Sequence, residues 1–146
     1  MYTRILVPID GSEHAKEALS VACKLLEKDA STLYLLHVPE TLGYTTSLVW
    51  GIGAINAGAS FDEREEAGKK LLEQAVKSAQ EQGAQHIEEI LTQGDPVRVI
   101  LDTAKTCDAD TIVMGSRGLS DLAGVVIGSV SHKVSHSAKC RVITVN

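Results

Sequence analysis

Residues 111–134 read TIVMGSRGLSDLAGVVIGSVSHKV, a short apolar run followed by widely spaced glycines. The first four residues have the continuous apolar character of a strand that is covered on both faces. Gly115 and Gly118 follow, and nine residues then separate Gly118 from the pair Gly128-Ser129. Glycines let main-chain N–H groups approach an anion closely, and a Gly-Ser pair at a helix start presents the positive end of the helix dipole. The pattern therefore predicts a strand, a phosphate-binding loop and a helix.

Strand-like segments recur along the rest of the chain. They predict further strands over residues 5–9, 32–38, 87–91 and 142–145. Pro8 lacks the N–H that a central strand needs, so we expect the pairing of the first strand to end there. Glu88 and Glu89 lie inside the third predicted strand, which indicates an exposed edge of the sheet.

Helix signals stand between these strands. Ser12 is a candidate cap for the first helix, Ser60 with Glu63 forms a capping box, and Asp95 with Pro96 starts the next helix. We expect the long second helix to end near Gly83. Its predicted buried stripe comprises Phe61, Ala67, Leu71, Ala75 and Ala79.

Alternation of strands and helices predicts an α/β fold with a mainly parallel, doubly wound sheet and helices on both faces. We expect a single domain over residues 1–146. If its five strands are wound in the order 3-2-1-4-5, the winding direction reverses between the first and fourth strands. Ligands bind beyond the carboxyl ends of the strands at such a reversal. Pro8-Ile9-Asp10 and Met114-Gly115 would then face one crevice.

Composition narrows the class of protein. The formal net charge is −5 and no Lys/Arg cluster appears, which argues against nucleic acid or an anionic membrane as a main partner. Aromatic residues are only 3%, so Val, Ile, Leu and Ala must build the core. The three cysteines, Cys23, Cys107 and Cys140, form no CxxC pair and are interpreted as reduced, structural thiols. No apolar stretch has signal-peptide or transmembrane length, so we expect a cytoplasmic protein.

The whole chain resembles the nucleotide-binding branch of the universal stress protein family. Three features carry the resemblance together: Pro8-Ile9-Asp10 at the end of the first strand, Leu36-His37-Val38 at the end of the second, and the G-x2-G-x9-G-[ST] pattern of the glycine-rich segment. The resemblance implies a Rossmann-like, HUP-type fold and an ATP site.

The resemblance also implies which residues form that site. The adenine pocket would comprise Pro8, Ile9 and Val38, with Asp10 near the adenosine part. The ribose would be lined by Met114 and Gly115. The triphosphate would be wrapped by Gly118, Gly128, Ser129 and Val130. Mg²⁺ or Mn²⁺ would be held through the phosphates, because these ions prefer phosphate oxygens and water to an all-protein cage.

Several of these residues have a purely structural alternative. Asp10 could form a turn that caps the first helix, Gly115 and Gly118 could relieve a crowded loop, and Ser129 could be only a helix cap. Among other polar residues, His37 lies beside the expected pocket with an undecided role. A lone loop arginine is usually solvated, so Arg117 is not assigned to the site. His132 and His136 stand four residues apart without a third metal ligand, which favours solvated positions.

No catalytic motif accompanies the predicted pocket: the sequence has neither a G-x-S-x-G elbow nor a G-x4-G-K-[ST] loop. We therefore expect a nucleotide-dependent regulatory protein rather than an enzyme. A slow ATPase or phosphotransferase, and a nucleotide-free dimeric interaction module, remain alternatives. The long apolar and glycine-rich segment 40–59 is interpreted as a lid, a partner surface or a simple loop. The last strand, from Val142 to Val145, is expected to be a sheet edge that pairs in a homodimer.

Overall fold

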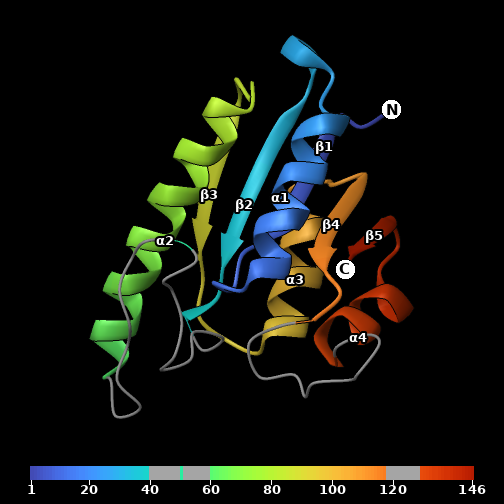
Figure 1. The fold of residues 1–146 in the computed structure, drawn as a ribbon. Helices are drawn as coiled ribbons and strands as arrows, with labels where there is room; N and C mark the ends of the chain where they lie inside the picture. The colour runs from blue at the N-terminus through green and yellow to red at the C-terminus, as the bar shows by residue number, and fades with distance from the viewer. Residues whose placement is uncertain (40–49, 51–59, 118–128) are drawn as a thin grey trace.

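The computed structural model describes residues 1–39, 50, 60–117 and 129–146 (Figure 1). The described residues contain a five-stranded parallel sheet with the order β3-β2-β1-β4-β5. Its strands are β1 (Arg4–Pro8), β2 (Thr32–His37), β3 (Ile87–Leu91), β4 (Thr111–Gly115) and β5 (Arg141–Val145). The predicted class and strand order are confirmed, and so is the end of β1 at Pro8.

Helices follow the strands at the positions that the cap signals predict. They are α1 (Glu13–Leu25), α2 (Phe61–Glu81), α3 (Pro96–Thr106) and α4 (Ser129–Ser137), with a short 3-10 helix η1 (Lys28–Ala30). The Ser12 hydroxyl accepts the N–H of Ala15 at 3.1 Å, and Ser60 with Glu63 forms the capping box. Asp95 accepts the N–H of Arg98 at 3.1 Å. These side chains satisfy N–H groups that a helix start leaves without partners.

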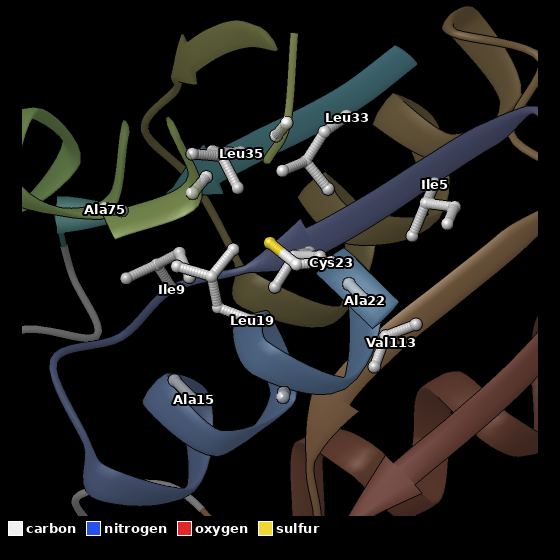
Figure 2. Close-up of a cluster of buried hydrophobic side chains, with 14 of the residues drawn as sticks. Ile5, Ile9, Ala15, Leu19, Ala22, Cys23, Leu33, Leu35, Ala75 and Val113 are labelled. Atoms are coloured by element: carbon white, nitrogen blue, oxygen red, sulfur yellow. The ribbon is translucent and has the colours of Figure 1, made fainter. Parts of the chain in front are cut away.

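Two apolar clusters cover the two faces of the sheet. On one face, α1 and α2 pack over β1 and β2, and Figure 2 shows Leu19, Ala22 and Cys23 of α1 turned toward Ile5 and Leu35. On the other face, residues of α3 and α4 pack with the alternate side chains of the same strands. The sheet is therefore doubly wound, and its central strand is buried on both sides as the apolar run predicts.

Buried thiols complete the apolar clusters. All three cysteines are free. Cys23 lies in the α1–α2 cluster, where burial raises the pKa of its thiol to about 11. Cys107 and Cys140 are half-buried at the edge of the opposite cluster, and burial raises their pKa values as well. None of these thiols has the lowered pKa of a reactive cysteine.

At the edges of the fold, one prediction of side-chain exposure is confirmed and one is wrong. The side chains of Glu88 and Glu89 are exposed on the edge strand β3, as expected. Phe61, predicted to lie in the buried stripe of α2, is 41% exposed, whereas Leu71, Ala75 and Ala79 are buried. The helix has 21 residues and is about 31 Å long, while a six-residue strand spans about 20 Å. Its first turn therefore extends beyond the sheet that covers the rest of the stripe (Figure 1).

Asp110 ties the start of β1 to the turn before β4. One carboxylate oxygen accepts the main-chain N–H groups of Thr3 and Arg4, both at 2.8 Å. This contact brings together segments more than one hundred residues apart, just before the register Ile5↔Thr111 begins. Asp110 therefore helps to fix how β1 and β4 align.

We expect Asp110→Ala to lower the free energy of unfolding by about 1–2 kcal/mol, because two N–H groups lose a charged acceptor. Urea unfolding followed by circular dichroism measures the change. Asp110→Asn is the control, because its amide oxygen still accepts both bonds and should preserve most of the stability. Equal losses for both variants would contradict the assigned role.

Candidate functional site

The reversal of the winding direction, where a crevice is predicted, lies between β1 and β4. β1 pairs with β2 along its whole length, from Arg4↔Thr32 to Pro8↔Leu36. With β4 its register comprises Ile5↔Thr111 and Leu6↔Ile112. The carboxyl ends of β1 and β4 therefore separate, and the connections that follow them lead to opposite faces of the sheet.

A tight turn leads from β1 into α1. The buried residue Ile9 continues the pairing of β1, since its N–H donates to the carbonyl of Leu36 at 2.7 Å. Asp10 then accepts the N–H of Ser12 at 2.9 Å through its side chain, and Gly11 has a φ of +89°. Such a left-handed backbone favours glycine. The structural alternative for Asp10, a turn that leads into the helix cap Ser12, is thus present in the fold.

The Asp10 carboxyl lies in surroundings that do not favour its charge. Burial raises its pKa above the ordinary value, although the hydrogen bond from Ser12 and the nearby His37 ring act in the opposite direction. If the Asp10 carboxyl served only to accept the hydrogen bond of the turn, its desolvation would bring no benefit. A carboxyl held in this way at a crevice is a candidate for ligand contact as well.

Gly115 brings the end of β4 against the first turn of α1. A Cβ atom at Gly115 would lie 2.7 Å from the Cβ and 2.9 Å from the carbonyl carbon of His14. Glycine is therefore required for packing at this position, as the structural alternative held. The same close approach places the end of β4 beside the first turn of the helix that Asp10 and Ser12 open.

The remaining predicted residues fall at three places around these strand ends. Met114 and Val38 are buried, and their side chains belong to the α3–α4 cluster. Ser129 is the exposed first residue of α4, and Val130 is half-buried behind it. Gly118 and Gly128 lie outside the described residues.

Two serines that the sequence analysis did not single out connect β4, β5 and α4. Ser116 is 2% exposed; its N–H donates to Val145 O at 2.8 Å and its hydroxyl to Asn146 Oδ1 at 2.7 Å. The carbonyl of Ser116 accepts the hydroxyl of the buried Ser131 at 2.8 Å. These bonds fix the first turn of α4 against the end of β4. Each of these hydrogen bonds depends on tertiary contacts. In the sequence, the only indication of them is a serine within or just after the glycine pattern.

Two further residues bear on the crevice. Trp50, the described residue of segment 40–59, is buried, and its indole N–H donates to the carbonyl of Ser12 at 3.0 Å. The rest of that segment, predicted as a lid, a partner surface or a loop, lies outside the described residues. Arg117 follows Ser116, and its buried Nε has no acceptor within the described part of the chain. A guanidinium donor with no acceptor among the described residues could bind an anionic ligand.

Two further observations concern metal ligands and membrane-spanning helices in the described ranges. His132 and His136 stack with ring centroids 5.9 Å apart, and no group of three potential metal ligands occurs among the residues that the structure describes. Over the same residues, no helix is both long and apolar enough to cross a membrane.

Comparisons with known proteins identify the family and the fold of the chain. The family model described as "Universal stress protein family" matches residues 1–146. The chain is similar to universal stress protein YxiE of Bacillus subtilis, with 39% identity over 148 residues that cover 99% of each chain. It is also similar to the structure of the universal stress protein from Archaeoglobus fulgidus in complex with dAMP (28% identity, TM-score 0.72, 99% and 98% of the chains covered). A universal stress protein in complex with cAMP has 25% identity and a TM-score of 0.72, with 99% and 97% covered.

We expect Gly115→Ala to destabilise the protein by about 1–3 kcal/mol, because the added methyl overlaps main-chain and side-chain atoms of His14. Thermal unfolding measured by calorimetry tests this. A melting temperature equal to that of the wild type would show that β4 and α1 are not in close contact here.

Asp10→Asn should raise the melting temperature at pH 7. The amide oxygen keeps the bond from Ser12, while the charge that burial disfavours is removed. Because the folded pKa is raised, the cost of ionisation is full above that pKa and absent below the ordinary value. The advantage of the variant should therefore shrink as the pH is lowered toward 4. A lower melting temperature at pH 7 would assign the carboxylate to fold stability instead.

Proposed function

The chain belongs to the universal stress protein family, and we propose that it is an ATP-binding member that acts as a nucleotide-dependent regulatory protein in the stress response. We further propose that residues 1–146 act as one domain in the cytoplasm. The observation that carries the proposal is the close approach of Gly115, at the reversal of the sheet, to the first turn of α1, the helix that the Asp10 turn leads into. Structures with the same fold that hold cAMP and dAMP support an adenine nucleotide as the ligand class.

In this proposal the strand ends recognise the adenosine. Pro8, Ile9 and Val38 border the base; the side chains of Ile9 and Val38 are buried in the apolar clusters, and both main-chain polar groups of Ile9 are bonded to β2. Asp10 lies near the adenosine part. Met114 and Gly115 contact the ribose, and the absence of a side chain at Gly115 lets a ligand approach its main chain.

The start of α4 holds the phosphates. Ser129 and Val130 stand at the positive end of the helix dipole, and the bond from Ser131 to Ser116 keeps that end beside β4. Arg117 Nε supplies a donor that has no acceptor among the described residues. Gly118 and Gly128 join the phosphate site on the strength of the sequence pattern. Mg²⁺ or Mn²⁺ enters through the phosphate oxygens.

ATP binding should stabilise the fold. At 100 times Kd the ligand contributes about 2.7 kcal/mol, which corresponds to several degrees at roughly 2–4 °C per kcal/mol. A thermal melt with and without Mg-ATP measures the shift, and the fluorescence of Trp50, the single tryptophan, reports binding at the adjacent turn.

Variants of the phosphate site sharpen this test. Ser129→Ala should reduce the shift and Gly118→Val should abolish it, because the first removes a donor and the second fills the space for a phosphate. The matched control is Ser135→Ala, an exposed serine in the same helix, which should leave the shift unchanged. No shift in the wild type would favour the nucleotide-free interaction module, and sustained ADP release that Gly128→Val abolishes would favour a slow ATPase.

We also propose that the protein forms a homodimer through β5. This strand lies at the edge of the sheet beside β4, and Val142 and Ile143 are half-buried rather than covered. Unpaired apolar edges tend to pair with another copy. Sedimentation equilibrium should give twice the 15.6 kDa mass of the chain. A species of 15.6 kDa at micromolar concentration would contradict the dimer.

A further inference from the structure

His37 is a fully buried polar residue at the carboxyl end of β2, next to the crevice. Its exposed fraction is 0%, so its side chain has no surface available to a ligand. The sequence alone assigns no role to His37, and the proposed nucleotide site does not use it directly. Burying a polar ring is unfavourable unless its hydrogen-bonding groups are satisfied, so its contacts indicate what it does.

The ring is bonded to the main chain of the neighbouring strand. His37 Nδ1 lies 2.6 Å from the carbonyl oxygen of Ile9. A carbonyl oxygen only accepts hydrogen bonds, so Nδ1 must carry the proton and donate it. The bond therefore connects the last residue of β2 to the residue that follows β1.

Helix α2 holds the ring in this position. A Cβ atom at Gly68 would lie 2.5 Å from His37 Cδ2 and 2.9 Å from its Nε2. The helix main chain thus rests directly on the imidazole. Because Gly68 lets the helix pack this closely against the ring, packing as well as the hydrogen bond to Ile9 holds the imidazole in place.

This bond controls the direction of the peptide that leads into the Asp10 turn. Both the N–H and the carbonyl of Ile9 are bonded to β2, to Leu36 and His37 respectively. In a trans peptide the carbonyl of one residue and the N–H of the next point in opposite directions. The N–H of Asp10 is therefore turned away from β2, toward the side where β4 no longer pairs with β1.

We propose that His37 is a positioning residue of the nucleotide site: through its Nδ1–H bond to Ile9 it holds the main-chain ends of β1 and β2 in the geometry that recognises the purine base, without touching the nucleotide. The inference rests on the proposed function. We expect His37 to affect the binding of the base and not that of the phosphates. Ile9 and Val38 border the expected base pocket, whereas α4, which is proposed to hold the phosphates, lies beyond β4.

The test measures the affinities of ATP and of inorganic tripolyphosphate by calorimetry. For His37→Leu the Kd for ATP should rise about tenfold, the effect of losing one buried hydrogen bond, while the Kd for tripolyphosphate stays unchanged. His37→Asn carries an amide N–H near the position of Nδ1 and should stay within about threefold of the wild type for ATP. Leu33→Ala, a buried change at the other end of β2, is the control for general destabilisation and should preserve both affinities.

An unchanged Kd for ATP in His37→Leu, or equal losses for ATP and tripolyphosphate, would overturn the inference while leaving ATP binding intact. Failure of the wild type to bind ATP would instead overturn the proposed function. The imidazole ¹⁵N spectrum of the wild-type protein tests the geometry without any variant. We expect a protonated Nδ1 for His37, and an unprotonated Nδ1 would contradict the bond to Ile9.

Discussion

The separation of β1 from β4 is the constraint on which the site depends. β1 is buried on both faces and paired with β2 along its whole length, so its carboxyl end is held to β2. Beyond Leu6 and Ile112 its partner on the other side departs, because the connections after β1 and β4 pass to opposite faces. A parallel sheet that reverses its winding must expose main-chain groups at this point. The topology of the sheet thus provides a place for a ligand, independently of the side chains around it.

Close contacts then bring the surrounding elements to these strand ends. At Gly115 the missing side chain lets α1 rest on β4, and at Gly68 it lets α2 rest on the His37 ring. Buried serines act in the same way by hydrogen bonding, since Ser131 fixes the start of α4 to Ser116. Core packing and the crevice are therefore parts of one arrangement, in which the residues that stabilise the fold also set the positions of the groups that face a ligand.

Local sequence signals predicted much of this structure. Caps at Ser12, Ser60 and Asp95, the apolar runs and the alternation of elements give the class of the fold, and the observed strand order is the one that the predicted crevice requires. Phe61 was assigned wrongly because periodicity does not reveal how far a helix extends past the sheet it covers. The bonds of His37, Ser116 and Ser131 escaped prediction for a related reason: their partners are defined by tertiary contacts, which a single sequence does not display.

In the proposed function, the ends of β1 and β4 form one nucleotide site with the start of α4. Amide chemical-shift changes on adding Mg-ATP locate the bound ligand residue by residue. We expect the largest changes at the N–H groups of Asp10, Gly115 and Val130. Changes concentrated at the opposite ends of the strands, around Thr3 and Thr111, or the absence of any change at millimolar ATP, would contradict this site.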